Sequence, residues 1–192
     1  MNEDATDTRE VGELVAEIGR LRDQVAHLQE RVESLDELAH QDHLVAMPNR
    51  RGFERELERL IARVGRYGSQ CAMLYVDVDG LKIINDTFGH SAGDQALIQI
   101  ATLLAKGLRR SDVVARIGGD EFGALLENVD QAKAQETADR LCDAIAAAEF
   151  THDGDPLPLG VAIGVAAIEA GDRIVDIMHR ADEDMYRRKA AA

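Results

Sequence analysis

Residues 113–126 read VVARIGGDEFGALL, and this stretch decides how the second half of the chain folds. The apolar runs at 113–117 and 122–126 have the length and composition of β-strands. Between them stand Gly118 and Gly119, which are typical of a tight hairpin because glycine permits a turn of unusual φ. The same glycines let a ligand approach the backbone closely, so the hairpin is a candidate binding element.

Acidic residues stand at the ends of two predicted strands. Residues 71–78 are almost continuously apolar, which predicts a buried central strand. Asp77 lies near the end of this strand and Asp79 directly after it. We expect one carboxylate on each face of the sheet. Asp120 and Glu121 follow the hairpin glycines. If the two strands are neighbours, these carboxylates converge on one spot, which suits Mg²⁺ with bound phosphates. Each of these acids alone would more often be a solvated turn residue.

Patterns in the rest of the chain predict the remaining elements. Helical periodicity predicts helices over 50–68, 80–107 with an interruption near Gly89, 130–148 and 174–189, and a further strand over 159–167. The strand and helix order is β-α-β-β-α-β, with a helix before it and a helix after it. Strands mixed with crossover helices predict an α/β sandwich in which helices cover a central sheet.

The first 39 residues carry an unbroken heptad repeat. Its apolar seam consists of Val11, Leu14, Ile18, Leu21, Val25, Leu28, Val32 and Leu35. β-Branched residues at the a positions and leucine at the d positions favour a parallel two-stranded coiled coil. The flanking pairs Glu17 with Arg22 and Arg31 with Asp36 have opposite charges, which agrees with that arrangement. The alternative is one amphipathic helix packed on its own domain. We therefore expect a coiled-coil dimerisation helix over 1–39 and a globular domain over 40–192.

Composition excludes several classes of function. The 192 residues carry a formal net charge of −14, which disfavours a broad nucleic-acid surface and docking on anionic lipid. The longest apolar runs are far shorter than a bilayer-spanning helix requires. Cys71 and Cys142 show no paired spacing, so we expect free thiols in a reducing compartment. These features together predict a cytoplasmic protein that binds neither nucleic acid nor membrane.

Three motifs carry a family resemblance. GGDEF at 118–122, DVDGLKIINDTFGHSAGD at 77–94 and ADEDMY at 181–186 resemble the motifs of GGDEF-domain diguanylate cyclases, and the resemblance extends from Asp42 to Lys189. It implies a nucleotidyl-cyclase-like α/β fold in which helices surround a central, mainly antiparallel sheet. It also implies a homodimeric enzyme that condenses two GTP molecules into cyclic di-GMP and pyrophosphate.

The resemblance further implies a role for each motif residue. Two Mg²⁺ or Mn²⁺ ions would be held by Asp77, Asp120 and the Val78 carbonyl, and guanine would be recognised by Asn85 and Asp94. The triphosphate would be contacted by Lys82 and Lys189, beside Gly118 and Gly119. The 3′-hydroxyl proton would be taken by Asp120 or Glu121. These residue types suit the chemistry, since phosphoryl transfer needs alignment and charge neutralisation above all. An amide and a carboxylate also match the polar edge of guanine.

Arg109 and Asp112 lie shortly before the hairpin and fit the RxxD inhibitory site of the family. The resemblance implies that this site binds the product, with Arg140 and Arg63 as supports. The alternative interpretation is ordinary solvated charge on helix surfaces. A different alternative for the whole protein is a non-catalytic cyclic di-GMP receptor or scaffold, a class that usually has a disrupted GGDEF motif.

Overall fold

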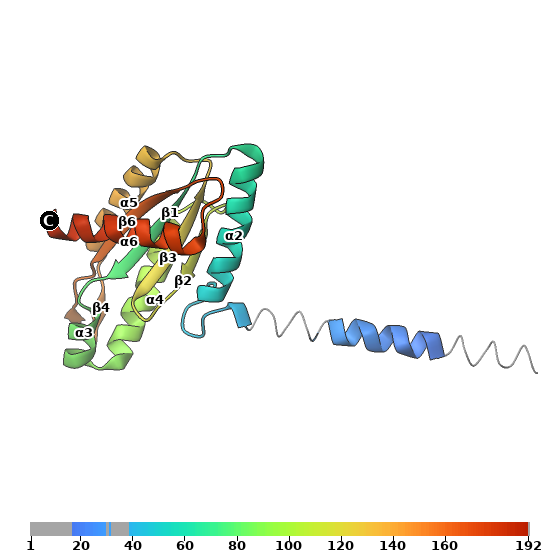
Figure 1. Cartoon of the computed structure of the whole chain (residues 1–192). Coiled ribbons are helices and arrows are strands. Elements are labelled where there is room, and N and C mark those ends of the chain that lie inside the picture. The colour runs from blue at the N-terminus through green and yellow to red at the C-terminus, as the bar shows by residue number, and fades with distance from the viewer. Residues whose placement is uncertain (1–16, 30, 32–38, 192) are drawn as a thin grey trace, which may run out of the picture. The chain divides into compact units, whose positions relative to one another are not determined.

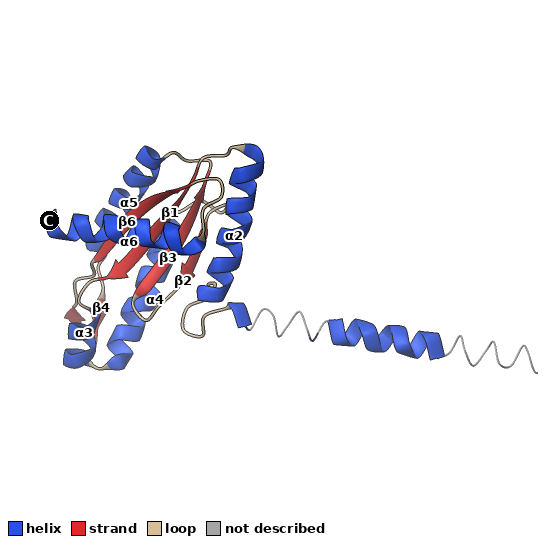
Figure 2. Ribbon diagram, in the orientation of Figure 1, coloured by secondary structure: helices blue, strands red, loops and turns tan. Residues whose placement is uncertain are grey.

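The structure is a computed structural model that describes residues 17–29, 31 and 39–191. The chain divides into two units, Met1–Ala39 and His40–Ala192, which are described separately. In the first unit, residues 17–29 form a helix (Figure 2). The part of the predicted seam on this helix is about half exposed, at 48–54%: Ile18, Leu21, Val25 and Leu28. The other seam positions, and Asp36, lie outside the described residues, so the coiled coil stays a prediction.

The second unit is built on a four-stranded antiparallel sheet (Figure 1). Its strands, in spatial order, are β2 (Val113–Arg116), β3 (Glu121–Glu127), β1 (Cys71–Val78) and β6 (Val161–Ile168). A separate two-stranded sheet is formed by β4 (Thr151–His152) and β5 (Asp155–Pro156), which are joined by a turn at Asp153 and Gly154. The predicted antiparallel central sheet is confirmed, and both halves of the predicted 113–126 hairpin are neighbouring strands.

Helices cover both faces of this sheet (Figure 2). They are α2 (Arg50–Tyr67), α3 (Leu81–Phe88), α4 (His90–Gly107), α5 (Gln131–Ala146) and α6 (Ile174–Ala191). Alternate residues of β1 serve the two core layers, as the two-residue period of a strand requires. Leu74 and Val76 pack in the layer with α4 and α5, whereas Met73 and Tyr75 pack in the layer with α2 and α6. The expected sandwich is therefore confirmed.

Local sequence signals explain where the helices begin and end. The Asn49 side chain accepts a hydrogen bond from the Gly52 N–H at the start of α2, and Asp130 caps α5 through the Lys133 N–H in the same way. Gly68, with φ +66°, ends α2, as the predicted helix over 50–68 requires.

The hairpin glycines do not have the unusual φ that was expected of them. Among the described residues, positive-φ glycines occur at Gly68, Gly80, Gly89, Gly154 and Gly171. The loop between β2 and β3 spans four residues, 117–120, and a loop of this length can turn without a left-handed residue. The reason for glycine at 118 is a close contact, described below.

Candidate active site

β1 and β3 bring the predicted acidic residues to one end of the sheet. Asp77 is paired with Glu121 in the antiparallel register. The Val78 N–H donates to the Asp120 carbonyl oxygen with an N–O distance of 2.9 Å. At the base of the hairpin the Ile117 N–H donates to the Glu121 carbonyl oxygen, also at 2.9 Å. The strand end and the hairpin are thus one continuous hydrogen-bonded structure, and it carries the carboxylates from both motifs.

Lys189, in the last turn of α6, contacts the two acids at the end of β1. Its Nζ donates to Asp77 Oδ2 and lies 3.2 Å from Asp79 Oδ1. The expectation that these acids lie on opposite faces is wrong, because residues two apart in an extended chain point the same way. Burial alone would lower the pKa of Lys189, but the hydrogen bonds to Asp77 and Asp79 raise that pKa above its ordinary value, so the ammonium stays protonated.

The carboxylate of Glu121 is held by neighbours on two sides. Tyr75 stands two residues before Asp77 on β1, with its hydroxyl close to the Glu121 carboxylate. Burial, together with hydrogen bonding to Glu121 and the Glu121 charge, raises the pKa of Tyr75. At Gly118 an added Cβ would lie only 2.1 Å from Glu121 Oε2. Glycine at this position therefore makes room for the carboxylate.

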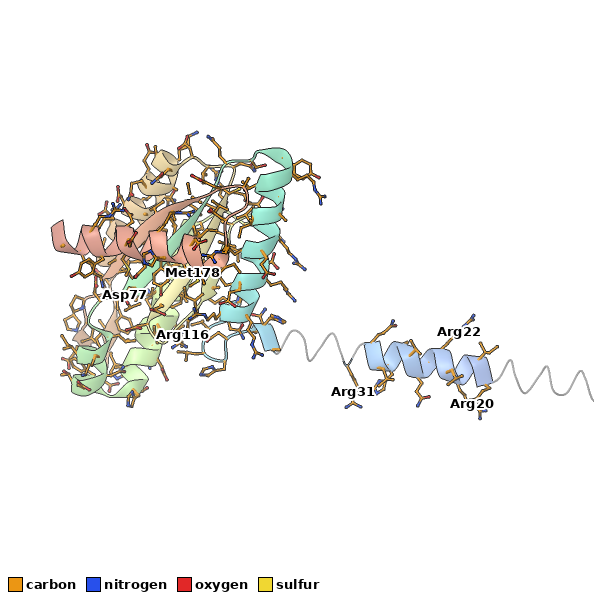
Figure 3. The ribbon with its side chains drawn as sticks, viewed as in Figure 1. Arg20, Arg22, Arg31, Asp77, Arg116 and Met178 are labelled. Atoms are coloured by element: carbon orange, nitrogen blue, oxygen red, sulfur yellow. The ribbon has the colours of Figure 1, made fainter. Side chains whose placement is uncertain are left out.

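Arg116, which is partly buried, links the hairpin to the segment that precedes α2 (Figure 3). Arg116 Nη2 donates to the Gly119 carbonyl oxygen at 2.7 Å, and Nη1 donates to Asp42 Oδ1 at 3.3 Å. Burial alone would raise the pKa of Asp42, but hydrogen bonds from the Val45 and Leu44 N–H groups and the guanidinium charge hold that pKa below its usual value. The sequence analysis missed this contact because its partners are 74 residues apart.

The predicted nucleotide-binding residues lie on α3 and α4. α3 follows Gly80, whose φ of +68° turns the chain directly after the acidic strand end. Lys82 is exposed on the first turn of α3, and Asn85 is half-buried at the start of the last turn of this helix. A Cβ at Gly93 would lie 2.0 Å from Asn85 Oδ1, so the amide packs against α4 one residue before the exposed Asp94.

A cavity of about 420 Å³ lies among the end of α4, the start of β2 and the face of α5. Arg109, Asp112 and Arg140 line it together, as the sequence analysis expected for the RxxD group. Asp112 Oδ2 accepts the Arg109 backbone N–H at 2.9 Å, and Arg140 Nη2 donates to the Gly107 carbonyl oxygen at 2.9 Å. Asp112 thus shapes the loop that presents the Arg109 side chain.

The fourth predicted member of this group lies beside the cavity. Arg63, on α2, forms an ion pair with the Glu127 carboxylate and does not line the cavity. The Glu127 N–H donates to Asp112 Oδ1 at 3.4 Å, so Arg63 is linked to the group indirectly. Lys133 does line the cavity, and the sequence analysis missed it. Its position seven residues before Arg140, and hence on the same helix face, was a usable signal.

The oxygen donors at the strand end suit a hard divalent cation. Asp77 and Asp120 offer carboxylates and Val78 a carbonyl, which are the ligands that Mg²⁺ and Mn²⁺ prefer. Across the described parts of the chain, no cluster of three His, Cys, Asp or Glu side chains could hold an ion by itself. Phosphates and water would supply the other ligands, as is usual for Mg²⁺. Asp77 and Asp79 both pair with the Lys189 ammonium, so this end of the strand attracts positive charge.

An antiparallel sheet that carries a GGDEF hairpin opposite an acidic strand end defines a class of protein. The family described as "Diguanylate cyclase, GGDEF domain" matches residues 39–192, and the chain belongs to this family. It is 38% identical over 160 residues to diguanylate cyclase DgcP of Pseudomonas aeruginosa, and 39% identical over 161 residues to diguanylate cyclase TpbB of the same species. Each alignment covers 83% of this chain, but only 24% and 37% of those longer relatives.

Solved structures show the same fold. The coiled coil and GGDEF domain of DgcB from Caulobacter crescentus, solved in complex with c-di-GMP, matches with a TM-score of 0.84 and 25% identity. That match covers 93% of this chain and 95% of the DgcB chain. In the described part of the present chain, no helix has the length and apolar character needed to cross a bilayer.

Proposed function

We propose that the globular unit is an active diguanylate cyclase that condenses two GTP molecules into cyclic di-GMP. One observation carries this proposal: Asp77 lies next to the Asp120-Glu121 pair at one end of the sheet. Asp120 and Glu121 belong to a GGDEF motif in which no position is disrupted. The named diguanylate cyclases among the relatives support it. Free cysteines at 71 and 142, and GTP as the substrate, favour the cytoplasm.

In the proposed reaction, each GTP is attacked by the 3′-hydroxyl oxygen of the other. A new bond forms between that oxygen and the α-phosphorus, the bond to pyrophosphate breaks, and the hydroxyl proton passes to Asp120 or Glu121. Asp77, Asp120 and the Val78 carbonyl would hold two Mg²⁺ or Mn²⁺ ions, whose charge stabilises the phosphates in the transition state. Lys82 and Lys189 add positive charge and orient the triphosphate in a protein that is otherwise strongly acidic.

The test of this function is direct. Purified protein incubated with GTP and Mg²⁺ should yield cyclic di-GMP and two equivalents of pyrophosphate. The second candidate function is a receptor that binds cyclic di-GMP without making it, and the arginine-lined cavity is the observation that favours it. A protein that binds cyclic di-GMP but forms none from GTP would support the receptor and contradict the cyclase.

Guanine selection by Asn85 and Asp94 gives a first prediction. We expect Asn85→Ala or Asp94→Ala to raise the KM for GTP by roughly tenfold and to weaken discrimination against ATP, because hydrogen bonds specific to guanine are lost. Initial rates at varied GTP, with ATP as competitor, measure both effects. The matched control is Asp86→Ala, which removes an exposed carboxylate from the same helix. Unaltered nucleotide preference in both site variants would contradict the assigned roles.

We further propose that the cavity lined by Arg109, Asp112 and Arg140 binds the product and inhibits synthesis. The long cationic side chains of Arg109, Lys133 and Arg140 all line this cavity. They suit the paired phosphates of a cyclic dinucleotide. The cavity lies apart from the acidic end of β1, since the two sites share no residue. Occupation of this cavity therefore need not displace GTP directly.

Product inhibition gives a second prediction. We expect wild-type progress curves to flatten as cyclic di-GMP accumulates, and Arg109→Ala to abolish the flattening at a similar initial rate. Arg110→Ala is the control, because it removes the same charge from the neighbouring residue, which does not line the cavity. Calorimetric titration of cyclic di-GMP checks the binding itself. If the Arg109 variant binds the product as tightly as wild type, this inhibitory site is wrong.

A further inference from the structure

Lys189 forms an ion pair with Asp77, the carboxylate on β1 that the proposed reaction needs as a metal ligand. Its Nζ is hydrogen-bonded to Asp77 Oδ2 and lies 3.2 Å from Asp79 Oδ1. The contact joins residues 112 positions apart, so the packing of α6 beside β1 creates it. The side chains of Lys189 and Asp77 expose 37% and 24% of their surface, so this ion pair is partly shielded from water.

The roles proposed for these two residues are incompatible with the contact between them. Asp77 would ligate a divalent cation, and Lys189 would contact the triphosphate. A divalent ion and an ammonium on one carboxylate repel each other strongly at a separation of a few ångströms in a partly shielded site. Asp77 is paired with the ammonium in the observed arrangement, so a divalent ion can bind Asp77 only if Lys189 moves.

We propose that Lys189 is an exchange residue that couples the binding of metal to the binding of nucleotide. In the nucleotide-free site its ammonium takes the place of the cation on Asp77, with Asp79 as a second anchor. When a divalent ion and GTP bind together, Lys189 leaves Asp77 for the phosphate oxygens, and Asp77 is freed to act as a metal ligand. The inference rests on the proposed function, because it assumes that Asp77 and Lys189 belong to the metal and triphosphate sites.

The position of Lys189 suits such an exchange. It stands in the last turn of α6, and its flexible four-carbon stem can redirect the ammonium without moving the helix. A metal ion that binds alone must displace the ammonium from Asp77, which leaves the ammonium with Asp79 in place of its two carboxylate partners. A nucleotide that binds alone must draw Lys189 away and leave Asp77 facing the phosphates uncompensated. Each ligand therefore strengthens the binding of the other, and by linkage the coupling is reciprocal.

The first test measures Mn²⁺ binding to the nucleotide-free protein by electron paramagnetic resonance. We expect Lys189→Met to tighten binding at the Asp77 site by roughly three- to tenfold, since the competing ammonium is gone. Arg188→Met is the matched control: it removes the same charge from the adjacent residue, which pairs with Asp139 instead. This control should leave Mn²⁺ affinity within about twofold of wild type. Unchanged or weaker Mn²⁺ binding in Lys189→Met would overturn the exchange.

The second test uses a non-hydrolysable GTP analogue in the presence of a chelator, so that no metal is bound. Lys189→Met should weaken analogue binding while it tightens Mn²⁺ binding, and these opposite signs are the signature of exchange. A tightening of both ligands would mean that Lys189 acts only as a competing charge, and it would contradict the proposal.

Asp77→Asn separates failure of the exchange from failure of the proposed function. This variant should lose the specific Mn²⁺ site. If it retains wild-type Mn²⁺ binding, the metal site lies elsewhere, and both the proposed metal ligands and the exchange are wrong. If Asp77→Asn loses Mn²⁺ but Lys189→Met gains none, the metal site stands and the exchange alone is refuted.

Discussion

Asp120→Asn is expected to reduce the rate of cyclic di-GMP synthesis by roughly 10²- to 10³-fold. It removes a carboxylate that is proposed to bind metal, or to accept the proton, where negative charge develops on the transferred phosphate. The side chain is exposed at the tip of the hairpin, and the backbone carbonyl that accepts the Val78 N–H is unchanged. The fold should therefore survive, with a melting temperature within a few degrees of wild type. Steady-state rates at saturating GTP and Mg²⁺, together with thermal melting, check both expectations.

Glu121→Gln should lower turnover to a similar degree. The amide has the same shape and can still accept the Tyr75 hydrogen bond, so the loss would reflect charge and basicity. The matched control is Asp153→Asn, which makes the same exchange of carboxylate for amide in the exposed β4–β5 turn. It should keep wild-type activity. If Asp120→Asn and Glu121→Gln both did so as well, the cyclase assignment would fail.

Binding measurements on the same variants can assign the base. Asp120 is the proposed metal ligand in the hairpin, so Asp120→Asn should weaken Mn²⁺ binding as well as turnover. Glu121 packs against Gly118 and Tyr75, which holds its carboxylate in a fixed place near Asp77, its partner in the β1–β3 register. If Glu121→Gln loses turnover while it keeps Mn²⁺ affinity, Glu121 is the proton acceptor.

Local signals in the sequence predicted the elements of the globular unit well. Asn49 and Asp130 each mark a helix start because a side-chain oxygen satisfies an otherwise unpaired backbone N–H. The apolar run at 71–78 had the continuous character of a strand buried on both faces, and β1 is that strand. Such signals act within a few residues, and for that reason they can be read without knowing the fold.

The contacts that tune the site could not be predicted in this way. Asp42 with Arg116, and Asp77 with Lys189, join positions 74 and 112 residues apart, and only the packing of the elements brings them together. The pairing of Lys189 with two acids also depends on their sharing one side of the strand end. An extended chain requires this arrangement for residues 77 and 79, so this feature, unlike the two long-range contacts, follows from the sequence.

The last prediction concerns the proposed coiled coil. The proposed reaction joins two GTP molecules through two equivalent attacks, which requires two sites that face each other across a two-fold axis. One domain holds half of the reactants, and a parallel coiled coil would tether two domains at high effective concentration.

Leu21→Asp combined with Leu28→Asp should split the dimer, because the two carboxylates would be buried unpaired in the seam. Both leucines are half exposed on the helix of one chain, which leaves their side chains accessible to a second helix. The control adds the same two carboxylates off the seam, as Gly19→Asp with Ala26→Asp, and should remain a dimer.

We expect the seam variant to sediment as a monomer and to lose roughly tenfold or more of its specific activity at low micromolar concentration. Its activity should recover as the protein concentration rises, because the domains can still meet by collision, whereas the control should show no such dependence. Sedimentation and initial rates over a hundredfold dilution series measure both. A dilute monomer that kept full activity would show that the helix is not needed for pairing, and it would remove the ground for two facing sites.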